Sequence, residues 1–277
     1  MKVYVSVDME GLAGVSHNKP TSRGDDGYPQ AVELMVGETN AAIEGAFDGG
    51  ATDVTVNDSH GGMFNLPPEK LDTRARLVQG NKPYTMAEAA REGAFDVALF
   101  VGYHARAGHP RGTLAHTYTG RITLVELGGR PAPEAAINAL YLGALGVPVG
   151  LVSGDDALAE EVTDWLPWAE RVVVKRAVSM KAADSLHPSV ARGLIRESSR
   201  RVVEKLAGGE HHLEPLVLAG PISLRIDFAH AGFADMAAMI PGFDRQGDRG
   251  VHFQSDDATT VFRAFVSAAD VSRAADD

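Results

Sequence analysis

Cysteine is absent from the 277-residue sequence, which excludes disulfide bonds, a cysteine nucleophile and thiolate metal sites. Long apolar runs are absent too: no stretch approaches the roughly 18 consecutive apolar residues that a membrane-spanning helix needs. No basic segment followed by an apolar stretch opens the chain, so no signal peptide is expected. We therefore expect a cytoplasmic protein that makes no membrane contact.

Positive charge is scarce: 26 Lys and Arg residues face 37 Asp and Glu residues, giving a formal net charge of −11. Nucleic-acid binding depends on clustered Lys and Arg that neutralise phosphates, so a nucleic-acid partner is not expected. Without thiolates, any bound metal must be held by His, Asp and Glu, a ligand set that suits zinc, manganese or a similar ion. Hydrophobic residues make up 44% of the chain, enough for a sizeable core.

Short apolar strands alternate with amphipathic helices along the first part of the chain. The expected strands cover residues 2–7, 51–60, 75–80, 95–104, 122–130 and 148–156. The expected helices cover residues 30–48, 84–93, 133–146 and 156–166. This alternation predicts parallel βαβ units, and so an α/β fold with a mostly parallel sheet and flanking helices.

The pattern changes near residue 170. A strand at 171–177 precedes a helix at 188–207, and the rest of the chain contributes two extended segments within 215–230 and a strand and helix within 250–269. We interpret this part as a smaller α+β portion. The pattern therefore predicts an α/β domain over residues 1–170 and a smaller portion over residues 171–277.

Three of the expected strands end in residues that bind metals. The first runs into "SVDMEG", which places Asp8 and Glu10 two residues apart and so on one side of an extended chain. Two others end in "NDSH" and "GYHA", which supply His60 and His104. Because open α/β sheets bind ligands outside the carboxyl ends of their strands, we expect these side chains to meet.

A metal ion would explain why two acids stand together. Neighbouring buried carboxylates raise one another's pKa, whereas a divalent cation keeps both ionised and imidazole nitrogens complete its ligand shell. A carboxylate between two ions can bridge them. The alternatives are purely structural: the acids and the Asp58-Ser59 pair as capping residues, and His104 as a packed core histidine.

Taken together, "SVDMEG" (6–11), "NDSH" (57–60), "GYHA" (102–105), "AHT" (115–117) and the segment around Glu134 resemble a known family. It is the D-aminopeptidase DppA family of zinc metallopeptidases, also called peptidase family M55. The order and spacing of the motifs match over about residues 1–160, and later segments extend the resemblance over nearly the whole chain.

The resemblance implies a site with two zinc ions. Carried over motif by motif, the metal ligands are Asp8, Glu10, His60, His104 and Glu134, with Asp8 as the bridge, and the catalytic residue is His116. One segment departs from the family pattern: where G-E-x-x-x-N-A is usual, this chain has "PAPEAAINA", which keeps the Glu-to-Asn spacing. Glu126 is the competing candidate for the last ligand.

The activity implied is zinc-dependent removal of the N-terminal residue from short peptides that contain D-amino acids. His116 would transfer protons, stabilise the tetrahedral intermediate or attack the carbonyl directly. The resemblance also implies a homo-oligomeric ring, described in the family as a decamer. Residues 1–170 would then be the metal-binding catalytic domain, and residues 171–277 are the candidate for subunit contacts. Two alternatives remain: a dinuclear phosphoesterase or amidohydrolase, with Arg106 and Arg111 as the only candidate phosphate clamps, and a non-catalytic protein that binds peptide or metal.

Overall fold

A mostly parallel sheet forms the centre of the computed structural model, which describes residues 1–91, 95–209 and 213–275. Its strands stand in the order β3-β2-β1-β4-β7-β8-β9, and every neighbouring pair is parallel except the final β8–β9 pair. Their bounds are β1 (Lys2–Val7), β2 (Asp53–Asp58), β3 (Arg76–Val78), β4 (Val97–Tyr103), β7 (Val149–Asp155), β8 (Glu170–Ser179) and β9 (Ala182–Ser185).

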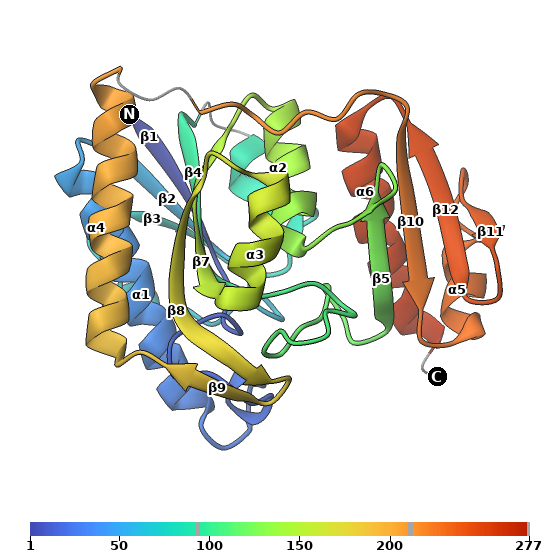
Figure 1. Ribbon diagram of the computed structural model, residues 1–277, viewed down its shortest axis with the longest axis horizontal. Coiled ribbons are helices and arrows are strands. Elements are labelled where there is room, and N and C mark those ends of the chain that lie inside the picture. The colour runs from blue at the N-terminus through green and yellow to red at the C-terminus, as the bar shows by residue number, and fades with distance from the viewer. Residues whose placement is uncertain (92–94, 210–212, 276–277) are drawn as a thin grey trace.

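Helices cover both faces of this sheet (Figure 1). Helices α1 (Tyr28–Asp48) and α4 (Pro188–Ala207) pack against each other and cover one face. Helices α2 (Glu134–Ala144) and α3 (Asp156–Trp165) lie on the other. Alternate residues of β1 serve the two layers: Val3, Val5 and Val7 pack in the core on the α1 side, whereas Tyr4 packs in the core on the α2 side.

An antiparallel sheet of five strands lies beyond α2, in the order β11-β12-β10-β5-β6. It consists of β5 (Ile122–Leu127), β6 (Arg130–Pro131), β10 (Ile222–Phe228), β11 (Asp244–Gln246) and β12 (Gly250–Ser255). Helix α6 (Ala258–Val271) packs on this sheet and on α2, and the short α5 (Ala231–Ala237) closes one end (Figure 1). Four 3₁₀ helices complete the described elements, at Lys19–Thr21, Pro68–Lys70, Thr85–Arg91 and Ser272–Ala275.

The expected fold class is confirmed, with several local differences. The helix expected at 84–93 is a 3₁₀ helix over Thr85–Arg91, and the last two expected residues lie outside the described part of the chain. Within 215–230 only Ile222–Phe228 forms a strand. Strands β9 and β11 and helix α5 were not predicted.

The two sheets do not divide at residue 170. Strands β8 and β9 and helix α4 join the parallel sheet from beyond that position, while β5 and β6 belong to the antiparallel sheet although they precede it. The expected assignment of catalysis to residues 1–170 and of subunit contacts to residues 171–277 stays a prediction.

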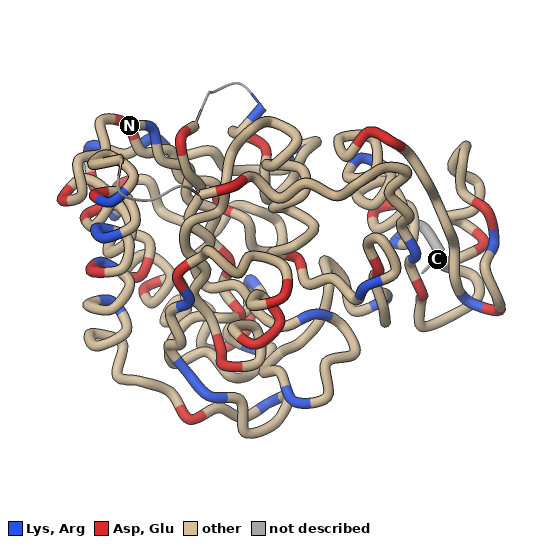
Figure 2. The backbone as a smooth tube through the Cα atoms, turned by 45° about the horizontal axis from the view of Figure 1, so that its top comes forward, with Lys and Arg blue, Asp and Glu red and all other residues tan. Residues whose placement is uncertain are grey.

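The surface carries charges of both signs. Acidic and basic residues are interspersed along the backbone instead of forming one large basic face (Figure 2). Among the described residues, no helix is both long enough and apolar enough to cross a membrane.

The chain after β1 passes very close to the end of β4. The Gly11 amide donates to the Gly102 carbonyl at 2.8 Å, and a Cβ placed on Gly11 would lie 1.8 Å from the Tyr103 carbonyl oxygen. Gly102 itself has a positive φ of 71°. Only glycine permits both the contact and the backbone conformation, so these residues fix how Asp8 approaches His104.

We expect Gly11→Ala to lower the free energy of unfolding by about 1–3 kcal/mol, because the added methyl group collides with backbone atoms. The measurement is urea unfolding followed by circular dichroism. Gly193→Ala is the matched control: this glycine lies within α4 with no atom within 4 Å of an added Cβ, so the change should leave stability unchanged or raise it. Equal stability of Gly11→Ala and wild type would contradict the packing constraint.

Candidate metal centre

Three neighbouring strands deliver their ends to one place, because β2, β1 and β4 are adjacent in the sheet. Asp8 follows β1, and His104 follows β4 directly. The prediction that Asp8 and Glu10 lie on one side of the chain required β1 to extend through Glu10. Instead β1 ends at Val7, and Glu10 lies in a turn. Both acids nevertheless face His60, whose Nδ1 lies 3.2 Å from Asp8 Oδ1 and 2.9 Å from Glu10 Oε2.

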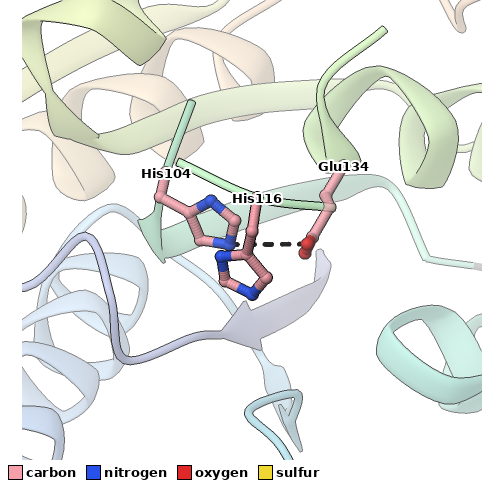
Figure 3. A group of neighbouring side chains, drawn as sticks. All are labelled: His104, His116 and Glu134. Atoms are coloured by element: carbon pink, nitrogen blue, oxygen red, sulfur yellow. Dashed lines mark ion pairs between the residues drawn. The ribbon is translucent and has the colours of Figure 1, made fainter. Parts of the chain in front are cut away.

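Glu134 reaches the same place from the other side as the first residue of α2. The Nε2 atom of His104 lies 3.4 Å from Glu134 Oε1 (Figure 3). The same Nε2 atom lies 3.3 Å from Asp8 Oδ2. The competing candidate, Glu126, stands on β5 of the antiparallel sheet, where it forms an ion pair of 3.6 Å with Arg225. The geometry therefore favours Glu134 over Glu126 as a ligand.

His116 comes from the loop between β4 and β5 and stacks on His104 (Figure 3). The two ring centres are 4.1 Å apart and the planes differ by 7°. Among the described residues, two groups each have potential ligand atoms that all lie within 4.8 Å of one another. One group is Asp8, Glu10 and His104, and the other is His104, His116 and Glu134. His116, expected only as a catalytic residue, thus lies within reach of a metal as well.

Backbone carbonyls orient all three imidazole rings. His60 Nε2 faces the Thr21 carbonyl at 2.6 Å, His104 Nδ1 the Ala105 carbonyl at 3.0 Å, and His116 Nδ1 the Leu114 carbonyl at 2.8 Å. A carbonyl can only accept, so each of these nitrogens carries the hydrogen. The opposite nitrogens, which face the carboxylates in His60 and His104, are left to bind a cation.

The charges of the cluster are coupled because it is buried: Asp8, Glu10 and Glu134 are 3%, 7% and 3% exposed. Burial opposes ionisation of Asp8, but His104 and His60 outweigh it and hold the Asp8 pKa well below its usual range. Burial likewise opposes charge on His104, yet Glu134 and Asp8 raise its pKa. Three carboxylates in this space therefore require positive charge between them.

A divalent metal ion fits this requirement better than protons alone. His104 Nε2 is buried and has no hydrogen-bond partner, although carboxylate oxygens of Asp8 and Glu134 stand on either side of it. Asp8 divides its two oxygens, turning Oδ1 to His60 and Oδ2 to His104. An oxygen and nitrogen donor set of this kind suits zinc.

A buried lysine holds the turn that carries Glu10, and no sequence motif predicted this role. Lys175 on β8 is 1% exposed, and its Nζ donates to the carbonyls of Glu10, Leu12 and Val15. Burial lowers its pKa to about 8. An irregularity in the β7–β8 pairing between Gly154 and Asp155 leaves Val174 and Lys175 both buried, which strict strand alternation would not allow.

The cluster opens into a cavity of about 560 Å³. The residues that line it include Asp8, Glu10, His60, His116 and Glu134, and on other sides Lys82, Asn81, Tyr118, Asp270 and Arg273. The arginines considered as phosphate clamps do not line it: Arg106 pairs with Glu161 at 2.8 Å and Arg111 with Asp156 at 2.7 Å. These two arginines therefore give no support to a phosphoesterase.

Comparison with known proteins agrees with this geometry. A family model described as D-aminopeptidase matches residues 1–267. The D-aminopeptidase of Bacillus subtilis (strain 168) is 35% identical over 268 residues, which cover 96% of each chain. A solved structure titled as the Zn-dependent D-aminopeptidase DppA from Bacillus subtilis, a self-compartmentalizing protease, superposes with a TM-score of 0.91. It is 33% identical and the match covers 99% of this chain and 98% of that one. This confirms the resemblance inferred from the motifs: the chain belongs to the D-aminopeptidase family.

Proposed function

We propose that this protein is a zinc-dependent aminopeptidase that removes the N-terminal residue from short peptides containing D-amino acids. The observation that carries the proposal is the division of the Asp8 carboxylate between His60 and His104 at the edge of a large cavity. Glu10 completes the set around His60, and Glu134 the set around His104. The names of the relatives support both the metal and the D-peptide substrate.

In this proposal two zinc ions would be held per subunit, and Asp8 would contribute to both. Asp8, Glu10 and His60 would hold one, and Asp8, His104 and Glu134 the other. When bound, zinc acts as a Lewis acid that polarises the scissile carbonyl. The backbone carbonyls of Thr21 and Ala105 keep the ligating nitrogens of His60 and His104 turned to the carboxylates.

His116 is the proposed proton carrier. Its Nδ1 hydrogen is committed to the Leu114 carbonyl, so Nε2 is the atom that takes up or releases a proton at the cavity. Stacking on His104 holds the ring parallel to a ligand and limits its rotation. Donation from the backbone N–H of Tyr118 to Glu134 Oε1 at 2.7 Å fixes the neighbouring loop against α2.

We further propose a cytoplasmic homo-oligomer whose ring encloses the active sites and admits short peptides. The description of the solved relative as self-compartmentalizing supports this. Exposed apolar side chains near the β8–β9 turn also support the oligomer, because Val178 is 67% and Met180 is 54% exposed. A single-chain mass in sedimentation experiments would contradict the assembly.

Removal of the metal should abolish hydrolysis of D-Ala-D-Ala, and added zinc should restore it, because the carboxylate cluster supplies no other Lewis acid. The assay compares D-Ala-D-Ala with L-Ala-L-Ala, before and after a chelator, with metal content measured in parallel. An aryl phosphate serves as the control for phosphoesterase activity. Full D-peptide hydrolysis in metal-free protein would reject the proposed function.

The two acids of the first motif should differ in their effect on metal content. Asp8→Ala removes a donor from both ligand sets, so we expect loss of both zinc ions. Glu10→Ala leaves Asp8, His104 and Glu134 complete, so one ion should remain. Mass spectrometry of the metals, with circular dichroism as a check on folding, measures this. The same stoichiometry in both variants would argue against a bridging Asp8.

His116→Ala should retain zinc but lower kcat by about 10²–10⁴-fold, the usual contribution of a positioned acid or base. Metal content is measured on the same sample, because His116 also lies near His104 and Glu134. His252→Ala, on β12 of the antiparallel sheet, is the control and should act as wild type. Wild-type turnover by a zinc-loaded His116→Ala variant would remove His116 from the mechanism.

A further inference from the structure

One cation in the cavity forms no ion pair with any carboxylate of the described residues. Lys82 lines the cavity together with the proposed zinc ligands. Building on the proposed function, we propose that the Lys82 ammonium binds the C-terminal carboxylate of the peptide substrate. The substrate class is then narrower than peptides in general: short peptides with a free carboxyl end, held at one end by the metal centre and at the other by Lys82.

The surroundings of Lys82 support this role. Its Nζ donates to the backbone carbonyl of Asp58 at 2.6 Å, which uses one of the three ammonium hydrogens. Among the described residues, no carboxylate forms an ion pair with it. Asp58 and Glu88 act on it electrostatically, but their carboxylates make their hydrogen bonds to other groups. The Asp58 carboxylate accepts from Asn65 and Leu66, and the Glu88 carboxylate accepts from the Tyr84 amide.

Lys82 is also partly withdrawn from water. Its side chain is half-buried, and this burial lowers its pKa to about 8, still leaving it mostly charged at neutral pH. Asp58 and Glu88 offset part of this effect through space without forming an ion pair. A carboxylate that binds the ammonium directly would compensate the rest of the desolvation cost.

Arg273, the other Lys or Arg residue of the cavity lining, differs from Lys82 in both its exposure and its ion pairing. Arg273 is exposed and forms an ion pair with Asp270, with 3.3 Å between Nη1 and Oδ1. Its charge is already compensated by a residue that lines the same cavity. Lys82 is therefore the better-placed partner for an incoming anion, and a cavity of about 560 Å³ is of the size that holds small ligands.

The test compares D-Ala-D-Ala with its C-terminal amide, using the zinc-loaded full-length protein. We expect wild type to prefer the free acid by about 10- to 100-fold in kcat/KM, the usual effect of one charged hydrogen bond, with the difference residing in KM. Lys82→Met should lose this preference while hydrolysing the amide as wild type does. Lys82→Arg should keep most of it.

Lys70→Met is the matched control, because Lys70 forms an exposed ion pair with Glu33 and does not line the cavity. Equal loss of activity toward both peptides in Lys82→Met would show that Lys82 only supports the end of β2 through Asp58. Equal use of acid and amide by wild type would overturn the carboxylate site and leave the aminopeptidase activity intact.

If wild type hydrolyses neither peptide, the proposed function itself fails. Calorimetric binding of the two peptides to the zinc-loaded protein then decides the role of Lys82. Tighter binding of the acid that disappears in Lys82→Met supports the site, and equal affinities reject it.

Discussion

Three carboxylates kept out of water within reach of one another set the requirement that the rest of this structure meets. Asp8, Glu10 and Glu134 are nearly inaccessible to solvent, where repulsion between like charges is only weakly screened. Two imidazoles interleave with them, each turned by a backbone carbonyl so that one nitrogen faces the acids. The centre is thus arranged for cations before any ion arrives.

Close contacts and hydrogen bonds to its backbone hold the turn after β1, which carries Glu10. The turn after β1 lies against β4 at glycines that leave no room for a side chain. The Lys175 ammonium donates hydrogen bonds to three backbone carbonyls of the same turn. The buried Glu38 carboxylate accepts a hydrogen bond from the Ala13 amide at 2.8 Å. Burial raises the pKa of Glu38 to about 7. The position of Glu10 is therefore determined by polar groups that are themselves buried.

Much of this arrangement could be predicted from the sequence, because local signals carry it. Apolar strands followed by Asp8, His60 and His104 predict both the parallel sheet and the place where its candidate ligands meet. The role of Lys175 could not be predicted, since it depends on an irregular register between β7 and β8 that no local pattern records. The sequence pattern also did not predict that β5 belongs to a second sheet, because its partner β10 is remote in the sequence. Lys82 gave no motif, and only its surroundings in the fold draw attention to it.

The pairing of β5 with β10 has a consequence for folding during synthesis. All five candidate ligands lie before residue 135, yet Leu127 pairs with Leu224, a contact that closes a loop of roughly 100 residues. Pairing between such distant segments is intrinsically slow. During synthesis, a ribosome-bound chain would carry every donor atom while still lacking β10, the strand that pairs with β5. The segment that leads from β5 to Glu134 therefore gains all its strand contacts only in the finished polypeptide.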